Sequence, residues 1–345
     1  MRHPDEIKNW GTQDYEEARE EHEKLQQDIK LSNSFPWNIL AILAGIFQIF
    51  LMSVIAMINH LFKLWRVDDL DRELAKNYFY VPEMAIQKKI ELSEFAKQEL
   101  DGKGIDFGCG NGIVGGILIR SKGISDLHGV DLNSFNKDQV LRYGYANFTA
   151  ADISLIPLDG DSFDYAISIC VLEHVDRMLD ALSEAHRLVR NGGEFVFTTP
   201  SPTYAISYLG YRLRQVFGLA RSARKFARRR DLISMHIHYY SEKDWRRLLE
   251  NKGFENIKIT QIFSQKQGLW YEILNWQVYF PRFYFSDKLQ TIGFRHPKFA
   301  KFAEWASANV TAALTNAKIT KQQCTHFFIS ATVSKQIVVS KEISC

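Results

Sequence analysis

The sequence predicts an α/β domain built on a parallel, doubly wound sheet. One observation is the run 104–112, Gly-Ile-Asp-Phe-Gly-Cys-Gly-Asn-Gly, in which a short apolar strand breaks into a glycine loop, with a helix following to about residue 120. The other is the alternation of apolar, β-rich runs with segments of helical periodicity between residues 104 and 200. This alternation is typical of helices that connect parallel strands.

Further strands are expected after the glycine loop, each ended by polar or turn residues. Apolar runs end at Asp131 and shortly before Asp152, and two more cover residues 162–170 and 192–200. Between the last two, residues 179–190 carry an apolar face at helical spacing. The order of these elements is therefore strand, helix and strand, repeated along the chain.

The last two strands are expected to form a hairpin that is interrupted. Residues 254–263 alternate between apolar and polar side chains, as a strand does, and its matching partner is 325–334. The segment 264–323 is then an insertion, and its composition favours helices. A structureless loop of that length would be improbable in a compact domain.

The glycine loop suits a nucleotide-like cofactor with a cationic group. Glycines at 108, 110 and 112 tolerate positive φ and let a ligand approach the backbone. Dinucleotide-binding loops place a third glycine where this chain has Ile113, and Asp106 suits an amine better than a pyrophosphate. Asp131, at the end of the second strand, can accept both hydroxyls of a ribose.

The run 104–200 resembles class I S-adenosylmethionine-dependent methyltransferases of the small-molecule branch, which includes quinone- and sugar-methylating enzymes. Its motifs at 104–112, 127–131, 145–153 and 171–175 follow one another at the spacing of that family. The resemblance implies a Rossmann-like sheet of seven strands in the order 3-2-1-4-5-7-6, with the last strand antiparallel. It also implies S-adenosyl-L-methionine as the cofactor.

The resemblance assigns the cofactor contacts residue by residue. The alternative for Asp152 is a role in turning the chain, because aspartate often follows a strand in this way. The residues expected to bind the cofactor are Asp106, Gly108, Gly110 and Gly112 at its methionine end, Asp131 and Leu132 at its ribose and adenine, Asp152 and Ile153 at the adenine edge, and Cys170 after the fourth strand.

Histidines are the candidate catalytic bases, because methylation of an oxygen or carbon atom requires removal of a proton. His174 is the best placed by the resemblance, and His236 is the second candidate; the alternative for His174 is a packing role at the start of a helix. His236 and His238 lack a third ligand at helical or hairpin spacing, so no metal site is predicted. The four cysteines show no metal or redox spacing either.

A membrane helix is expected over residues 38–62, after a polar segment 1–37. Within it, residues 39–58 are interrupted only by Gln48 and Ser53. At about 1.5 Å per residue, twenty residues span roughly 30 Å, the thickness of a hydrocarbon core. A buried core helix is the alternative. Because the cofactor is cytosolic, the methyltransferase domain, 75–335, is expected on the cytosolic side, in a single-pass or monotopic protein with a short tail, 336–345.

Two insertions in that domain suggest a lipid surface. The insertion 203–238 contains the stretch 203–230, which has no acidic residue, many arginines and interleaved aromatic residues. Such a stretch is attracted by anionic lipid, and nucleic acid is the competing partner. The insertion 264–323 carries a dense aromatic run around residues 270–285.

The sequence therefore predicts a membrane-anchored methyltransferase that acts on a lipid-linked or amphipathic small molecule by O- or C-methylation. Two alternatives remain open at this point. One is an RNA-directed methyltransferase that uses the arginine-rich insertion. The other is a catalytically degenerate cofactor-binding domain that serves as a membrane scaffold.

Overall fold

A computed structural model describes residues 16–24, 35–274, 296–315 and 325–335. In helices, the side chains of residues 35–42, 44, 45, 265 and 266 lie outside this description. The polar segment 1–37 and the tail 336–345 expected from the sequence therefore lie largely outside the described residues. Residues 16–24 form a short helix.

The centre of the molecule is one seven-stranded sheet in the order β3-β2-β1-β4-β5-β7-β6. The five strands from β3 to β5 are parallel, and β7 runs antiparallel to both β5 and β6. The strand order expected from the sequence is confirmed. The strands are β1 Lys103–Phe107, β2 Asp126–Asp131, β3 Asn147–Ala150, β4 Phe163–Ile169, β5 Val189–Pro200, β6 Phe254–Ile262 and β7 His326–Val333.

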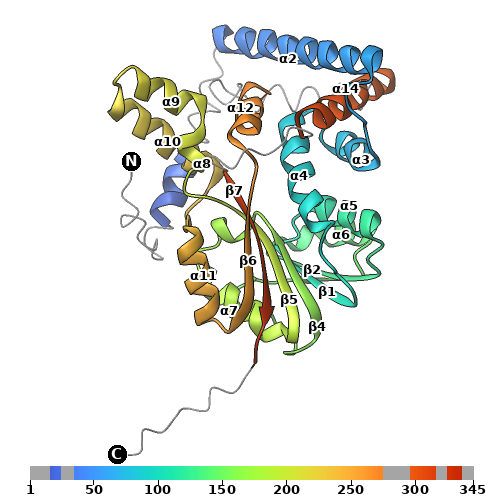
Figure 1. Ribbon diagram of the computed structural model, residues 1–345, viewed down its shortest axis with the longest axis vertical. Helices are drawn as coiled ribbons and strands as arrows, with labels where there is room; N and C mark the ends of the chain where they lie inside the picture. Colours follow the sequence, from blue (N-terminus) through green and yellow to red (C-terminus); the bar gives the residue numbers. More distant parts are fainter. Residues whose placement is uncertain (1–15, 25–34, 275–295, 316–324, 336–345) are drawn as a thin grey trace, which may run out of the picture.

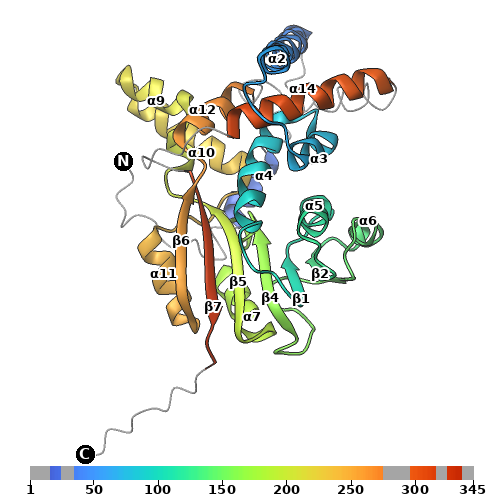
Figure 2. The ribbon, with the colours of Figure 1, turned by 45° about the vertical axis from the view of Figure 1, so that its right-hand side comes forward.

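Helices cover both faces of this sheet, as the alternation of the sequence predicts (Figures 1 and 2). Along β5 the side chains alternate, so that Val196 packs in one core while Phe195 and Phe197 pack in the other. The first core contains α4 (Pro82–Phe95), α5 (Ile113–Lys122) and α6 (Lys137–Arg142). The second contains α7 (Met178–Leu188) and α11 (Glu242–Asn251), with Trp245 of α11 against Phe197.

A helical layer lies beyond the end of the sheet where the parallel strands terminate (Figure 1). It is built from residues before the sheet and from both insertions. Within it, α14 contacts α2, α3 and α4. Its helices are α2 Phe35–Phe62, α3 Asp69–Tyr78, α8 Tyr204–Ser207, α9 Leu209–Val216, α10 Ala220–Ser234, α12 Gln265–Leu274 and α14 Pro297–Thr315.

The helix expected over residues 38–62 forms as α2, but its surroundings differ from those of an isolated membrane helix. One face of α2 packs on the domain, and Gln48, Met52, Ala56 and Asn59 are buried. Asn59 donates a hydrogen bond from Nδ2 to Oδ1 of Asn309 in α14, at 2.7 Å. In the described part of the chain, no helix has both the length and the apolarity needed to cross a membrane.

The two insertions are only partly as expected. The basic insertion 203–238 folds as α8, α9 and α10, and most of its cations are exposed, but Arg230 is buried. Arg230 therefore does not belong to the exposed basic surface, because α10 turns it toward Tyr208. The aromatic insertion 264–323 is helical where described, and most of its aromatic run lies in 275–295, outside the described residues.

Candidate active site

The glycine loop joins β1 to α5 and leaves its backbone open at one point. Gly108, Gly110 and Gly112 all have positive φ, at 76°, 56° and 79°. A Cβ atom on Gly108 would lie 2.5 Å from Val171, and one on Gly112 would lie 2.8 Å from the Cα of Val140. A Cβ on Gly110 would meet nothing within 4 Å. The outer glycines are therefore required by packing, while Gly110 presents bare backbone to open space.

Asp131 ties the loop to the end of β2. Its Oδ2 accepts a hydrogen bond from the amide of Gly110 and its Oδ1 accepts one from the amide of Asn133, both at 2.9 Å. Leu132 is next to it and is 76% exposed. A carboxylate beside an exposed leucine, at the carboxyl end of a parallel strand, is the arrangement expected for a ribose and an adenine.

Asp152 and Ile153 follow β3, which pairs directly with β2 so that Asp131 lies opposite Ala150. Asp152 is exposed, and its Oδ1 accepts a hydrogen bond from the amide of Ser154 at 2.8 Å. Ile153 is buried. The structure thus brings the predicted residues of the second and third strands to one edge. Asp152 forms a turn through this hydrogen bond, so its role in adenine binding stays a prediction.

Asp106 is the buried acid of the site. Its side chain is in the core beneath the loop, and its Oδ2 accepts a hydrogen bond from the Tyr145 hydroxyl at 2.6 Å. Burial raises the pKa of Asp106 from its ordinary value of 3.8 to about 7, although the Tyr145 hydrogen bond opposes this shift. A cation that binds beside Asp106 would lower the pKa of this carboxyl and so favour its charged form.

Cys170 ends β4 in a left-handed conformation, with φ of 55°. Its amide donates to the carbonyl of Thr198, and its thiol donates to Oε1 of Glu91, at 3.1 Å and 3.0 Å. Burial raises the pKa of the Cys170 thiol well above its ordinary value, so this sulfur is a protonated hydrogen-bond donor. The residue predicted to touch the cofactor therefore also links β4 to α4.

Helix α4 contributes an ion pair that sequence reasoning missed. Lys88 and Glu91 are both buried, and their Nζ and Oε2 atoms are 2.7 Å apart. Burial alone would raise the pKa of Glu91, but the charge of Lys88 holds it below its ordinary value. Gln87 donates to Oε1 of the same carboxylate at 2.9 Å. In the sequence these residues resemble an ordinary solvated helix face.

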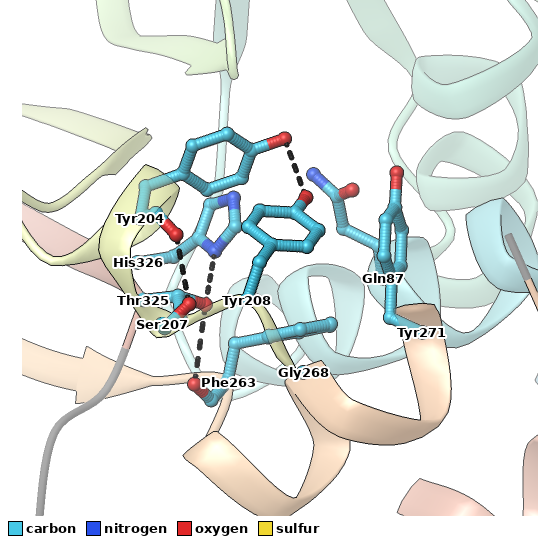
Figure 3. Close-up of a pocket in the computed structure, with 9 residues that line it drawn as sticks. All are labelled: Gln87, Tyr204, Ser207, Tyr208, Phe263, Gly268, Tyr271, Thr325 and His326. Atoms are coloured by element: carbon cyan, nitrogen blue, oxygen red, sulfur yellow. Dashed lines mark hydrogen bonds between the residues drawn. The ribbon is translucent and has the colours of Figure 1, made fainter. Parts of the chain in front are cut away.

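A small pocket lined by aromatic and polar side chains adjoins this cluster (Figure 3). Gln87 links the two, since it lines the pocket and its Nε2 is 3.7 Å from the Cys170 sulfur. Figure 3 shows rings and polar tips drawn from α4, α8, α12 and the start of β7 around one space. The lining residues are Gln87, Tyr204, Ser207, Tyr208, Phe263, Gly268, Tyr271, Thr325 and His326.

The two predicted histidine bases lie together beside this pocket. The rings of His174 and His236 have centroids 5.0 Å apart, and the ring of His236 is 4.8 Å from that of Tyr204. Although His174 is partly exposed, desolvation lowers the pKa of its ring, and burial lowers that of His236 well below the ordinary value. Both imidazoles are therefore neutral at physiological pH.

Hydrogen bonds define which ring nitrogen of each histidine is free to accept a proton. Nδ1 of His174 lies 3.0 Å from the carbonyl oxygen of Met235, which can only accept, so this nitrogen carries the hydrogen. The Tyr239 hydroxyl donates to Asp231, so its oxygen accepts from Nδ1 of His236. In both rings the lone pair is then on Nε2.

Glu173 is the third titratable residue beside His174 and His236, and it is buried. It is 1% exposed, its two carboxyl oxygens have no hydrogen-bond partner in the described structure, and burial raises its pKa to about 8. Its oxygen and the ring nitrogens of His174 and His236 lie within 4.8 Å of one another, a spacing that could hold a divalent metal ion. The sequence did not predict this third group. His238 is held apart, with its ring against the Val175 carbonyl at 2.7 Å.

His326 is a further residue that the sequence analysis missed. It begins β7, lines the pocket, and has its pKa lowered to about 4 by burial. Its Nδ1 is 2.9 Å from Oγ1 of Thr325, and its ring packs edge-on against Tyr204. A histidine at the first position of an antiparallel strand that begins at the ligand-binding edge was the available signal.

The sheet order, the open glycine loop and the acids at the ends of β1 and β2 fit a domain that binds a nucleoside-bearing cofactor. The family model of the methyltransferase domain matches residues 80–259, which is 180 of the 345 residues. The chain belongs to this family, and it is an S-adenosylmethionine-dependent methyltransferase.

Individual relatives are more distant. Malonyl-[acyl-carrier protein] O-methyltransferase of Salmonella typhimurium is 36% identical over 96 residues, which are 28% of this chain and 38% of that protein. A possible histamine N-methyltransferase of Thermotoga maritima has 17% identity and a TM-score of 0.44, covering 75% of this chain and 91% of its own. Phosphoethanolamine N-methyltransferase 2 of Haemonchus contortus has 16% identity and a TM-score of 0.42, covering 72% and 52%.

The residues present fit the cofactor. Open space beside Gly110 admits a ligand to the backbone, Asp131 offers acceptors for a ribose, and Asp106 offers a carboxyl for an amine. S-adenosylmethionine supplies an electrophilic methyl group. The protein's part is to align an acceptor with that methyl group and to remove a proton where the acceptor is an oxygen or carbon atom.

Proposed function

We propose that this methyltransferase acts at a membrane surface on a lipid-linked or amphipathic small molecule, with transfer to an oxygen or carbon atom. The observation that carries the proposal is the inverted polarity of α2. Its polar residues Gln48 and Asn59 face the protein, whereas its outward side is mostly apolar, with His60 as an exposed polar residue near its end. The exposed apolar residues of α2 are Leu43, Ile46, Phe47, Phe50, Val54, Met57, Ile58, Leu61 and Phe62.

A stripe of this kind is costly in water. The exposed residues recur three and four positions apart, so they form one side of the helix. Contiguous exposed apolar patches on soluble monomers are usually limited to a few hundred Å² and mark interaction sites when larger. Phe50 and Leu61 are 63% and 67% exposed. A lipid phase would cover such residues and would leave the paired polar groups on the protein side.

The α9–α10 connection offers a second contact of the same chemistry. Val216 and Phe217 are 79% and 73% exposed at the end of α9, and Arg221 and Arg224 of α10 are exposed beside them in sequence. Both views place α9 and α2 at the same end of the molecule, beyond the edge of the sheet (Figures 1 and 2). Each arginine near an anionic surface contributes about 1 kcal/mol of attraction.

The acceptor would enter from that end. The pocket lined by Tyr204 and Tyr208 lies directly after β5, and these residues begin the same insertion whose far end is apolar and basic. The neutral Nε2 atoms of His174 and His236 are candidate proton acceptors beside it. The curated relative is an O-methyltransferase, which supports an oxygen acceptor.

Vesicle flotation of the full chain tests the membrane part of this proposal. The wild type should float with anionic vesicles, and a Phe47→Ser, Phe50→Ser, Leu61→Ser variant should stay behind while retaining affinity for S-adenosylhomocysteine. A matched variant with Leu141→Ser and Leu179→Ser, two exposed leucines on α6 and α7, should float like the wild type. Equal flotation of all three proteins would contradict the role of α2.

Labelling tests the acceptor class. Membranes and a soluble small-molecule fraction would each be incubated with the enzyme and methyl-labelled S-adenosylmethionine, and the label should enter the organic extract of the membranes. Label that appears in added RNA would favour the RNA-directed alternative, as would RNA binding with a steep salt dependence. A chain that binds the cofactor but transfers no label to any fraction would favour the scaffold alternative.

A further inference from the structure

Arg230 is a buried cation with no counter-ion among the described residues. Its side chain lies on the inner side of α10 and is 3% exposed. Nη2 donates a hydrogen bond to the Tyr208 hydroxyl at 2.8 Å, and the guanidinium carbon lies 4.4 Å from the centre of that ring. Among the described residues, Nε and Nη1 have no partner, and no carboxylate forms an ion pair with this guanidinium.

This arrangement is unusual for a residue that serves only the fold. Removing a guanidinium from water costs several kcal/mol, and proteins normally repay this cost with a paired acid. Leaving two donors of a charged group unsatisfied adds to that cost. Apart from burial, the groups with the largest effect on the pKa of Arg230 are tyrosines 208, 204 and 271, and no carboxylate is among them. Within the described chain, Arg230 therefore has no carboxylate at ion-pair distance.

The hydrogen bonds of Arg230 lead to the pocket. The Tyr208 hydroxyl, which accepts from Arg230, donates its own proton to the Tyr204 hydroxyl at 3.0 Å. Tyr204 accepts this bond, and its own hydroxyl proton has no acceptor in the described structure. Both tyrosines line the pocket, as does Tyr271 (Figure 3). This chain of hydrogen bonds from Arg230 through Tyr208 thus ends at the Tyr204 hydroxyl, a donor in the pocket wall that the positive charge of Arg230 polarises.

We propose that the pocket binds an acceptor through an oxyanion, a carboxylate or phosphate group, whose charge is balanced by Arg230 and which accepts a hydrogen bond from Tyr204. This inference rests on the proposed function, because it names the chemistry of the acceptor that the same pocket takes. It assigns Arg230, Tyr208 and Tyr204 to substrate recognition. The aromatic rings of the pocket then hold the apolar part of the acceptor next to the oxyanion.

A pair of isosteric probes tests the charge directly. Full-length protein in detergent, saturated with S-adenosylhomocysteine, would be titrated by calorimetry with benzoate and with benzamide, which differ chiefly in charge. Benzoate should bind at least tenfold more tightly, as expected for one charge-assisted hydrogen bond. Phenyl phosphate, titrated in the same way, identifies which of the two oxyanions the pocket prefers. Equal affinity for benzoate and benzamide in the wild type would overturn the inference without any variant.

Variants then locate the charge. Arg230→Gln should abolish the preference for benzoate, and Tyr208→Phe, which keeps the charge but breaks the chain of hydrogen bonds, should reduce it. Arg221→Gln on the exposed side of α10 is the matched control and should leave it unchanged. If Arg230→Gln does not fold, the inference is tested by Tyr208→Phe alone, which should reduce the preference for benzoate. A preference that survives in Tyr208→Phe and in any folded Arg230 variant would contradict the assignment.

Cofactor binding distinguishes a failure of the proposed function from a failure of the oxyanion site alone. Failure of the wild type to bind S-adenosylhomocysteine would remove the proposed function, and the inference with it. Normal cofactor binding without a preference for the anionic probe would remove only the oxyanion site.

Discussion

Replacing Asp106 with Asn should stabilise the fold at alkaline pH. The carboxyl is buried, and its pKa of about 7 in the folded protein compares with an ordinary value of 3.8. The folded state therefore keeps a proton that the unfolded state loses, and the wild type loses stability as pH rises between these two values. The substituted amide would not titrate, and its side-chain oxygen can still accept the Tyr145 hydrogen bond.

The size of the effect follows from the two pKa values. With 1.36 kcal/mol per pKa unit, the proton linkage destabilises the wild type by about 2 kcal/mol at pH 5 and by about 4 kcal/mol at pH 8. The Asp106→Asn variant escapes this penalty, so its advantage over the wild type should grow by between about 2 and 3 kcal/mol across that range. Other buried acids, such as Glu173, titrate in both proteins and cancel in the difference.

Urea unfolding of both full-length proteins at pH 5 and pH 8, in the same detergent, measures this difference. The same samples should show weaker binding of S-adenosylhomocysteine to the variant at pH 8, because the amine of the ligand loses its carboxylate. A stability difference that is identical at the two pH values would refute the reasoning. It would mean that Asp106 is not the buried, protonated acid inferred from its surroundings.

Two further predictions concern the cofactor and the membrane. Asp131→Ala should weaken S-adenosylhomocysteine binding roughly tenfold or more, since a charge-assisted acceptor for ribose hydroxyls contributes about 1.5–3 kcal/mol; unchanged affinity by calorimetry would remove Asp131 from the site. Replacing four exposed arginines with Gln should weaken vesicle binding and reduce its salt dependence while cofactor affinity stays intact, and a loss of cofactor affinity would instead indicate a folding defect. The four are Arg221, Arg224, Arg228 and Arg229.

The fold class could be predicted from the residues of the sequence, and the strand order followed from the resemblance to the methyltransferase family. A strand, a glycine loop and a helix are local features, and residues 104–112 carry all three signals within nine positions. Parallel strands bring their carboxyl ends to one edge, so acids at the ends of consecutive strands must meet. This is why Asp106, Asp131 and Asp152 could be grouped without coordinates.

Only the tertiary structure decided which charged and polar residues are buried. Lys88 and Glu91 resemble a solvated helix face until α4 packs over the end of β4, and Glu173 acquires its raised pKa of about 8 from that same enclosure. Arg230 could not be distinguished from the exposed arginines around it, because its burial depends on Tyr208, which lies in another part of the insertion.

The same limit applies to α2. Its apolar run predicts a helix in an apolar environment, but the run is too uniform to indicate which side contacts the protein. That side is set by α14, 250 positions later in the chain, where Asn309 pairs with Asn59. Local composition determines which segments form helices and strands, whereas the burial of a given side chain depends on partners that only folding brings together.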